Sequence, residues 1–540
     1  MSASVTCTSL FFSWPDGTPV LEGLDIAFGP GRTGLVGVNG SGKSTLLKLI
    51  AGELAPADGT VRVAGEVGYL PQNVTLDTAL RVDEVLGVSA QRAALHAIEA
   101  GDVSEEHFET VGDDWDVEER ALATLGELGL GHIGLDRRIG EVSGGESVLL
   151  RLAALLLRRP DVLLLDEPTN NLDLYARRRL YSAVASWPGV MVVVSHDREL
   201  LDLVDQIADL RAGEVTWYGG NFSAYEEALA VEQEAAERMV RVAESDFRRQ
   251  KRELVDAQVK LAHRRRYAQK MYDTKREPRA VMKLKSRSAQ VSAGKHRIMH
   301  EEKLAEARDR LDEAVEAVRD DDEIRVDLPY TAVPPGRTVL TLMDLELAYG
   351  ARVRGGLDLR GPERVALIGR NGAGKTTLLR TIAGELEAVS GEATAHVPLR
   401  FLPQRLDVLD GELSVAENVA RFAPGATNNR VRARLARFLF RGARADQQAS
   451  TLSGGERFRA ALAALMLAEP APQLLMLDEP TNNLDMASVR QLTSALESYE
   501  GALVVASHDL PFLESIGITR WLMLDGELRE VTPQTLESLS

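Results

Sequence analysis

The fold is decided by a nine-residue stretch, Gly37-Val38-Asn39-Gly40-Ser41-Gly42-Lys43-Ser44-Thr45, and by its second copy, Gly369-Arg370-Asn371-Gly372-Ala373-Gly374-Lys375-Thr376-Thr377. Each copy has the form G-x-x-x-x-G-K-[S/T], follows an apolar run and begins a helical pattern. In this context the backbone N–H groups of the loop curl around phosphate oxygens, and the helix N-terminus adds its positive dipole end. Two copies predict a nucleotide-binding protein built from a repeat.

Individual loop residues have predicted roles. Lys43 and Lys375 are expected to reach the β- and γ-phosphates of ATP, and Ser44 and Thr376 to bind Mg²⁺. The remaining ATP-binding residues predicted in the loops are Gly37, Asn39, Gly40, Ser41, Gly42, Thr45, Gly369, Asn371, Gly372, Ala373, Gly374 and Thr377.

Length and composition limit the number of domains and the kinds of site that the chain can form. The 540 residues suffice for two or three domains, and the single cysteine excludes an intramolecular disulfide and a four-cysteine zinc site. Residues 1–10 lack the basic start and apolar core of a signal peptide, and no stretch reaches the ~20 apolar residues of a membrane helix. The sequence therefore predicts a cytoplasmic protein with no membrane segment.

Two buried strands are each expected to end in reactive side chains. The apolar run 162–165 leads into Asp166-Glu167, and the run 190–194 leads into Ser195-His196-Asp197. Asp166 is predicted to hold Mg²⁺ through water and Glu167 to accept a proton from the attacking water. His196 is predicted to contact the γ-phosphate and orient that water.

Three further features of the first half fit a nucleotide site. Trp14 precedes the phosphate loop by about the distance at which ATPases with such a loop carry an aromatic residue that stacks on adenine, although a core or edge tryptophan is the alternative. Gln72 follows a predicted strand, and its amide can contact Mg²⁺ and water together. Ser143, Gly144 and Gly145 lie at a helix start, where exposed backbone amides suit an anion.

The second half repeats this set. Its members are Tyr349 for adenine stacking, Gln404 and Asp478 for Mg²⁺, Ser453, Gly454 and Gly455 at a helix start, and Glu479 and His508 for catalysis. The lysine-to-glutamine spacing is 29 positions and the aspartate-to-histidine spacing is 30 in both halves. Between the glutamine and the SGGE motif, the first half is longer by 22 residues.

The order of these motifs resembles the ATP-binding cassette superfamily. The sequence Asp-Glu-Pro-Thr-Asn-Asn-Leu-Asp at 166–173 and 478–485, with two fused cassettes, is similar to the ABC-F family. The resemblance covers both cassettes and implies two P-loop α/β domains joined by an antiparallel α-helical hairpin. It also implies ATPase activity with ATP and Mg²⁺ at two hydrolytically competent sites.

In such ATPases the two cassettes close head to tail, with the functional unit formed by one chain. The resemblance therefore implies that Ser453 and Gly454 complete the site of Lys43, and that Ser143 and Gly144 complete the site of Lys375. ABC-F members bind the ribosome at the tRNA exit site and act as translation factors or antibiotic-resistance factors. The two roles stay open here.

The segment between the cassettes changes to long helix. Val240, Phe247, Leu254 and Leu261 recur every seven residues, and Leu304, Leu311, Val315 and Val318 form a second stripe, which indicates a coiled-coil hairpin. A first helix of some 45 residues would extend roughly 65–70 Å. The predicted domains are cassette 1 at 1–221, the linker at 222–327 and cassette 2 at 328–540.

The linker is basic in an acidic protein. Residues 248–300 hold 17 Lys or Arg against four Asp or Glu, whereas the whole chain has a net charge of -18. Clustered cations suit a phosphate backbone, and the family's linker reaches peptidyl-tRNA and ribosomal RNA. The predicted RNA-binding residues are Arg264, Arg265, Arg266, Lys275, Arg276, Arg279, Lys283, Lys285 and Arg287. A solvated coiled linker is the alternative.

Two other functions are compatible with twin cassettes. One is the ATPase subunit of a membrane exporter with a separate membrane partner, for which the basic hairpin has no obvious use. The other is a DNA-repair ATPase, but that class carries several zinc-binding cysteines and this chain has only Cys7.

Overall fold

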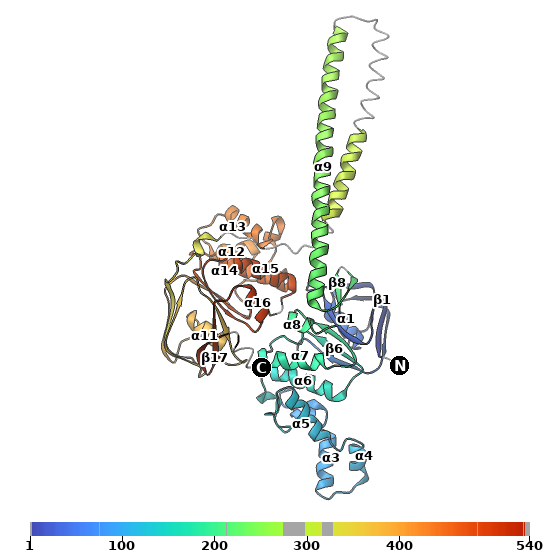
Figure 1. The fold of residues 1–540 in the computed structure, drawn as a ribbon, viewed down its shortest axis with the longest axis vertical. Helices are drawn as coiled ribbons and strands as arrows, with labels where there is room; N and C mark the ends of the chain where they lie inside the picture. The colour runs from blue at the N-terminus through green and yellow to red at the C-terminus, as the bar shows by residue number, and fades with distance from the viewer. Residues whose placement is uncertain are drawn as a thin grey trace. The chain divides into compact units, whose positions relative to one another are not determined.

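The computed structural model describes residues 3–74, 76–211, 213–273, 298–315, 324, 328–482, 484–532 and 534. Contacts group these residues into one unit of Met1–Ser223 with Asp322–Ser540, which holds both cassettes, and a second unit of Ala224–Asp321. The α/β fold with two cassette sheets and a helical insertion is confirmed (Figure 1). The exact limits 1–221, 222–327 and 328–540 stay predictions.

A six-stranded sheet forms the centre of the first cassette. Its order is β5-β6-β7-β3-β8-β9, parallel except for the last pair. β6 and β7 are buried along their whole length, as expected of apolar strands covered on both faces. The strands are β3 (Gly31–Val36), β5 (Val67–Leu70), β6 (Val162–Asp166), β7 (Val190–Val194), β8 (Gln206–Arg211) and β9 (Glu214–Gly219).

Helices and a second sheet cover this sheet. An antiparallel sheet of order β2-β1-β4, with β1 (Ser4–Ser13), β2 (Pro19–Phe28) and β4 (Asp58–Ala64), shares one hydrophobic core with α1 (Lys43–Ile50). The other core contains residues of most of the remaining helices. These helices are α2 (Val82–Leu86), α3 (Ser89–Glu99), α4 (Glu105–Val111), α5 (Val117–Glu127), α6 (Gly144–Arg158), α7 (Leu174–Ala185) and α8 (Arg198–Leu201).

The second cassette repeats this plan with its strands joined into one nine-stranded sheet, β13-β10-β11-β18-β17-β12-β16-β15-β14. Its strands are β10 (Thr338–Glu346), β11 (Arg352–Arg360), β12 (Arg364–Ile368), β13 (Ser390–Ala395), β14 (Leu399–Leu402), β15 (Leu474–Asp478), β16 (Ala502–Ala506), β17 (Arg520–Asp525) and β18 (Glu527–Val531). Its helices are α11 (Lys375–Ile382), α12 (Val415–Phe422), α13 (Asn428–Leu435), α14 (Gly454–Met466), α15 (Met486–Glu497) and α16 (Leu510–Ser515).

The 22 extra residues of the first cassette form a helical pair. The starts of α2 and α5, Val82 and Val117, are 35 positions apart, whereas the starts of α12 and α13, Val415 and Asn428, are 13 apart. The difference is filled by α3 and α4, which lie side by side (Figure 1). The insertion is therefore a local elaboration that leaves the sheet and its motifs unchanged.

The linker is a helical hairpin within its own unit. α9 (Phe222–Asp273) has 52 residues, longer than the predicted 45, and extends about 78 Å at about 1.5 Å per residue. Residues 298–315 form a second helix that runs antiparallel beside it (Figure 1). Arg310 pairs with Asp246 of α9 at 3.3 Å. In the described part of the chain, no helix has an apolar stretch long enough to cross a bilayer.

One predicted stripe of this hairpin is partly wrong. Val240, Phe247, Leu254, Leu261, Leu304 and Leu311 are half-buried as expected, but Val315 is 53% exposed. The buried positions are Ala307 and Ala314, so the stripe runs 304, 307, 311, 314 with alternating spacings of three and four. The small alanines gave a weak hydrophobic signal. Val318 lies outside the described residues.

Candidate functional site

Each nine-residue loop connects the end of a central strand to a helix, β3 to α1 and β12 to α11. Gly37 (φ 149°) and Gly369 (φ 154°) adopt a backbone conformation that favours glycine. A Cβ atom at either position would lie 2.3 Å from the Leu210 carbonyl oxygen or 2.2 Å from that of Leu524. Only glycine therefore allows the loop to pass so close to the neighbouring strand.

The two loop lysines are buried and held by the loop itself. Lys43 Nζ donates to the carbonyl oxygens of Gly37 at 2.9 Å and Val38 at 3.0 Å, and Lys375 Nζ donates to that of Gly369 at 2.8 Å. Burial lowers the pKa of both lysines. Each ammonium is thus fixed inside the loop, where a phosphate would lie.

The aspartates after β6 and β15 have different surroundings. Asp166 accepts hydrogen bonds from Ser44 Oγ at 3.0 Å and from the hydroxyl of Tyr69 at 3.3 Å. Neither carboxylate oxygen of Asp478 accepts a hydrogen bond of good geometry within the described residues, and Phe401 stands where the first cassette has Tyr69. Burial raises the pKa of both aspartates.

These surroundings fit a divalent cation. A buried carboxylate without a partner is costly, and a hard cation such as Mg²⁺ binds carboxylate and hydroxyl oxygens. Asp478 offers two oxygens that accept no hydrogen bond of good geometry among the described residues, although Thr376 is near enough to lower its pKa, and Asp166 lies next to the Ser44 hydroxyl. Tyr69 was not predicted as part of the site. Its only signal is its place three residues before Gln72, at the end of β5.

Each glutamate lies within reach of a histidine. His196 Nε2 is 3.1 Å from Glu167 Oε1, and His508 Nε2 is 3.4 Å from Glu479 Oε1. Glu167 (φ 48°) and Glu479 (φ 47°) both lie in the left-handed region, which costs about 1–3 kcal/mol for a residue with a side chain. The same strained turn in both halves places the carboxylate beside the histidine.

Burial sets the charge of these pairs. It raises the pKa of Glu167 to about 8 and that of Glu479 to about 7. It lowers the pKa of His196 to about 3 and that of His508 well below its ordinary value, so both imidazoles are neutral at pH 7. In the second site Lys375 Nζ donates to His508 Nε2 at 2.8 Å, which places the imidazole proton on Nδ1.

The serine–glycine motifs begin helices as predicted. Ser143 and Ser453 cap α6 and α14, and in each case the glutamate three residues later accepts the N–H of the serine in return. Ser143, Gly144, Ser453 and Gly454 are exposed, whereas Gly145 and Gly455 are buried. A Cβ atom on Gly145 would lie 3.4 Å from Asn371 Nδ2, so this motif approaches the phosphate loop of the other cassette.

Hydrogen bonds connect each loop to the opposite cassette. The N–H of Asn39 donates to Asp485 Oδ2 at 3.0 Å, and the N–H of Asn371 donates to Asp173 Oδ2 at 3.2 Å. Asn371 Nδ2 also donates to the carbonyl oxygen of Asn171 at 2.6 Å. Asp173 and Asp485 end the two Asp-Glu-Pro-Thr-Asn-Asn-Leu-Asp motifs. Their role across the cassettes was not predicted, because the motif only marked the family resemblance.

Other predicted ligands are not brought to the loops. Trp14 is 39% exposed and packs edge-on against Phe12, with ring centroids 5.2 Å apart, and Tyr349 is 84% exposed. Gln72 and Gln404 are exposed and form no hydrogen bond with Asp166 or Asp478 in the described structure. Their roles in stacking and Mg²⁺ binding stay predictions.

The predicted RNA-binding residues are described only in part. Arg266 is exposed on α9. Arg264 and Arg265 belong to the same helix, but their side chains lie outside the described residues. The remaining predicted RNA contacts, Lys275, Arg276, Arg279, Lys283, Lys285 and Arg287, also lie outside them.

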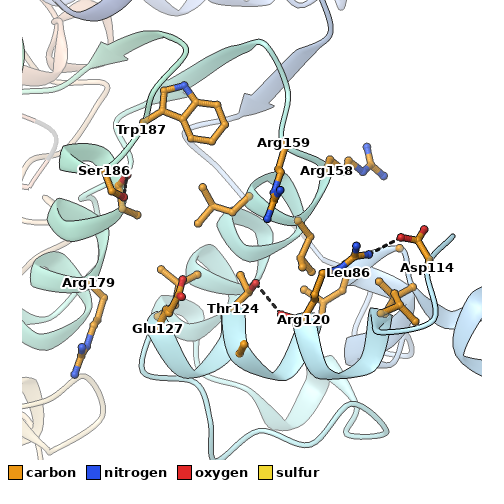
Figure 2. A pocket seen from close by; sticks show the side chains of 18 of the residues that line it. Leu86, Asp114, Arg120, Thr124, Glu127, Arg158, Arg159, Arg179, Ser186 and Trp187 are labelled. Atoms are coloured by element: carbon orange, nitrogen blue, oxygen red, sulfur yellow. Dashed lines mark hydrogen bonds and ion pairs between the residues drawn. The ribbon is translucent and has the colours of Figure 1, made fainter.

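A separate cavity of about 980 Å³ lies between α5, α6 and α7 of the first cassette (Figure 2). Its arginines are Arg120, Arg158, Arg159 and Arg179. Figure 2 shows Arg120 paired with Asp114, at 2.6 Å, while Arg158 and Arg159 extend from the end of α6. None of its lining residues belongs to a phosphate loop, a strand-end carboxylate or a histidine motif.

Comparison with known proteins places these sites in a family. Residues 21–170 and 355–482 match the family model described as "ABC transporter". The chain is 31% identical to the probable ATP-binding protein YheS of Escherichia coli K12, over 95% of this chain and 77% of YheS. It is 34% identical to the tylosin resistance ATP-binding protein TlrC of Streptomyces fradiae, over 92% of each chain.

Among solved structures, the archaeal ribosome recycling factor aABCE1, in complex with the ribosomal stalk protein aP1, has the same fold. Its TM-score is 0.55 and its sequence identity 19%, and the match covers 97% of this chain and 89% of that one.

Proposed function

Since the chain belongs to the ABC-F group of the ATP-binding cassette family, we propose that it hydrolyses ATP at two sites and acts on the ribosome. One observation carries the first part of the proposal. In both cassettes the lysine of the phosphate loop, a strand-end aspartate, and a glutamate–histidine pair within 3.4 Å converge at the same edge of the sheet. These side chains are the parts that phosphoryl transfer to water requires.

The chemistry follows from these groups. Lys43 and Lys375 would bind the β- and γ-phosphates, because each ammonium is already fixed in its loop. Mg²⁺, when bound, neutralises phosphate charge, and Ser44 with Asp166 or Thr376 with Asp478 would hold it. Glu167 and Glu479, with pKa values of about 8 and 7, titrate near neutral pH, and in their ionised form they would accept a proton from water. The neutral histidines would orient that water.

The test of hydrolysis is phosphate release by the unmodified chain, by Glu167→Gln and Glu479→Gln singly, and by the double variant. Two competent sites predict substantial turnover in each single variant and a loss of at least about 100-fold in the double variant, since a general base contributes about 10²–10⁴-fold. Loss of all turnover from Glu479→Gln alone, with Glu167→Gln silent, would contradict two competent sites.

The basic linker supports action on the ribosome. Residues 248–300 carry an excess of 13 positive charges in a chain of net charge -18, in a linker whose first helix, α9, is about 78 Å long. A localised basic region of this kind suits ribosomal RNA and peptidyl-tRNA. A protein that acts on ribosomes in this way would work in the cytoplasm. The relative TlrC is named for tylosin resistance, which supports antibiotic resistance as the role. Elongation of protein synthesis is the other role within the same proposal.

A matched pair of linker variants tests the RNA contact. Arg264→Gln, Arg265→Gln and Arg266→Gln together remove three cations from the distal part of α9. Arg238→Gln, Arg241→Gln and Arg248→Gln remove three from its proximal part, where each arginine already pairs with a glutamate four residues earlier. The affinity for ribosomes, measured by pelleting at increasing salt, should fall in the distal variant and stay unchanged in the proximal variant. The slope of log affinity against log salt concentration should become smaller in the distal variant by up to about three, one for each lost phosphate contact. If the distal variant binds ribosomes as tightly as the unmodified chain, the distal arginines are excluded as RNA contacts.

A further inference from the structure

The two cassettes differ at one buried position between their ATP sites. Between the strand-end aspartate and the histidine, the halves align with an offset of 312, which pairs Asp173 with Asp485 and His196 with His508. At this offset Arg177 of α7 corresponds to Val489 of α15. Arginine carries a positive charge and five N–H donors, whereas valine has neither. The two cassettes therefore differ in charge and hydrogen bonding at this position.

Arg177 binds the loop that follows β7 in its own cassette and contains His196 and Asp197. Its Nη1 donates to Asp197 Oδ2 at 3.3 Å, and the hydroxyl of Tyr181 donates to the same oxygen at 2.7 Å. The side chains of Arg177 and Asp197 are only 11% and 7% exposed. Arg177 Nε is buried without a hydrogen-bond partner among the described residues, so one carboxylate does not satisfy this guanidinium.

The same face of α7 is turned toward the second cassette. Asp173, one turn before Arg177 on that face, accepts the N–H of Asn371 at 3.2 Å. Asp173, Tyr175 and Arg178 also line a small cavity together with Gly369 and His508. Burial lowers the pKa of Arg177, but Asp197, Tyr181, and then Asp509 and Glu479 of the second cassette raise it above its ordinary value.

The neighbouring aspartates explain what this cation can do. Asp197 and Asp509 each follow the histidine of their site, and each caps a short helix, accepting the N–H of Leu200 at 3.1 Å or of Phe512 at 3.0 Å. Asp197 pairs with Arg177 directly, and the charge of Asp509 contributes to the raised pKa of Arg177. A cation near two like charges offsets their repulsion and orients the loops that carry them.

We propose that Arg177 is a positioning residue for the second ATP site, to which it supplies a cation from the first cassette, whereas the equivalent residue of the second cassette, Val489, has no charge. The inference rests on the proposed hydrolysis at both sites and adds that the sites are not equivalent. The other charged or titratable groups in this region include Glu199, Arg178 and Arg198 of the first cassette and Lys375 and His508 of the second. Arg177 acts on the Asp509 loop and, through it, on His508.

Hydrogen–deuterium exchange tests this link without requiring turnover. Arg177→Met removes the cation, Arg177→Lys keeps it, and Val489→Met is the matched control in the second cassette. With Mg-ATP, Arg177→Met should speed exchange of the amides at 510–516 by at least about threefold, while Arg177→Lys and Val489→Met leave them near the unmodified rate. Faster exchange confined to 198–204 would overturn the proposal, because Arg177 would then act only within its own cassette.

Steady-state kinetics then compare the two sites. In the Glu167→Gln background, where only the second site turns over, Arg177→Met should lower kcat at least about fivefold with KM for ATP changed less than about twofold, and Arg177→Lys should restore it. In the Glu479→Gln background the loss should stay below about twofold. Equal losses would contradict a one-sided role. Absence of turnover in the unmodified chain would refute the proposed hydrolysis, while the exchange experiment would still decide the role of Arg177.

Discussion

The backbone N–H of Asn39 donates to Asp485 Oδ2 at 3.0 Å across 446 positions of the chain, and Asn371 makes the equivalent bond to Asp173 at 3.2 Å. Each aspartate uses its other oxygen, Oδ1, to cap the helix that follows it. One carboxylate thus fixes a local helix start and a phosphate loop of the other cassette. The two functions can be separated by mutation.

Asp173→Ser and Asp485→Ser should keep the helix cap and lose the bond to the loop, because serine caps as well as aspartate but offers one oxygen. A hydrogen bond contributes about 0.5–1.5 kcal/mol, so kcat/KM for ATP should fall about 2- to 13-fold with little change in melting temperature. Asp→Asn at the same positions should lower kcat/KM further, because the side-chain NH₂ group of asparagine would face the backbone N–H of the loop. Two donors would then oppose each other. Serine variants with unchanged kinetics would show that the bond does not matter for catalysis.

The exposed aromatics Trp14 and Tyr349 are predicted to stack on adenine. Trp14→Leu and Tyr349→Leu should each raise the ATP concentration needed for half-saturation by about 2- to 13-fold, because an aromatic pair contributes about 0.5–1.5 kcal/mol beyond its buried area. Trp14→Phe and Tyr349→Phe should retain most of the affinity. Titration with a fluorescent ATP analogue measures the affinity directly. Unchanged affinity in the leucine variants would show that neither aromatic side chain stacks on adenine.

The hairpin packs through alanines, so its stability should respond to their size. Ala307 and Ala314 are buried, and a leucine at either position should overpack the helix pair at a cost of about 1–3 kcal/mol. Val315→Ala, at the exposed neighbouring position, should change stability by less than about 0.5 kcal/mol. Hydrogen exchange of amides 298–315 reports the local effect. A larger effect from Val315→Ala than from Ala314→Leu would restore the stripe predicted from the sequence.

Cys7 should be inert in the native protein. Its side chain is 2% exposed in the core of the first cassette, and burial raises the pKa of its thiol to about 11. Because only the thiolate is alkylated, iodoacetamide at pH 8 should leave the native chain unlabelled and label it after denaturation. Rapid native labelling would mean that β1 opens under these conditions.

The features that the sequence predicted correctly are local in the chain. Glycine spacing predicted the phosphate loops, and apolar runs predicted the buried strands at 162–166 and 190–194. The seven-residue spacing of apolar residues predicted the helical linker. Tyr69, Arg177 and the bonds of Asp173 and Asp485 to the opposite loops could not be predicted in this way. Their partners are distant in sequence, and each residue type is common on surfaces. The Val315 error has a related cause, since alanine is too small to stand out in a hydrophobic stripe.

The most direct test of the central claim is sucrose-gradient sedimentation of the Glu167→Gln, Glu479→Gln double variant in ribosome-containing lysate, with and without ATP. Removing both candidate bases should trap the chain with ATP bound and the cassettes closed. Migration with ribosomes is expected only when ATP is present. A variant that retains labelled ATP but stays at the top of the gradient would contradict an ATP-dependent action on the ribosome.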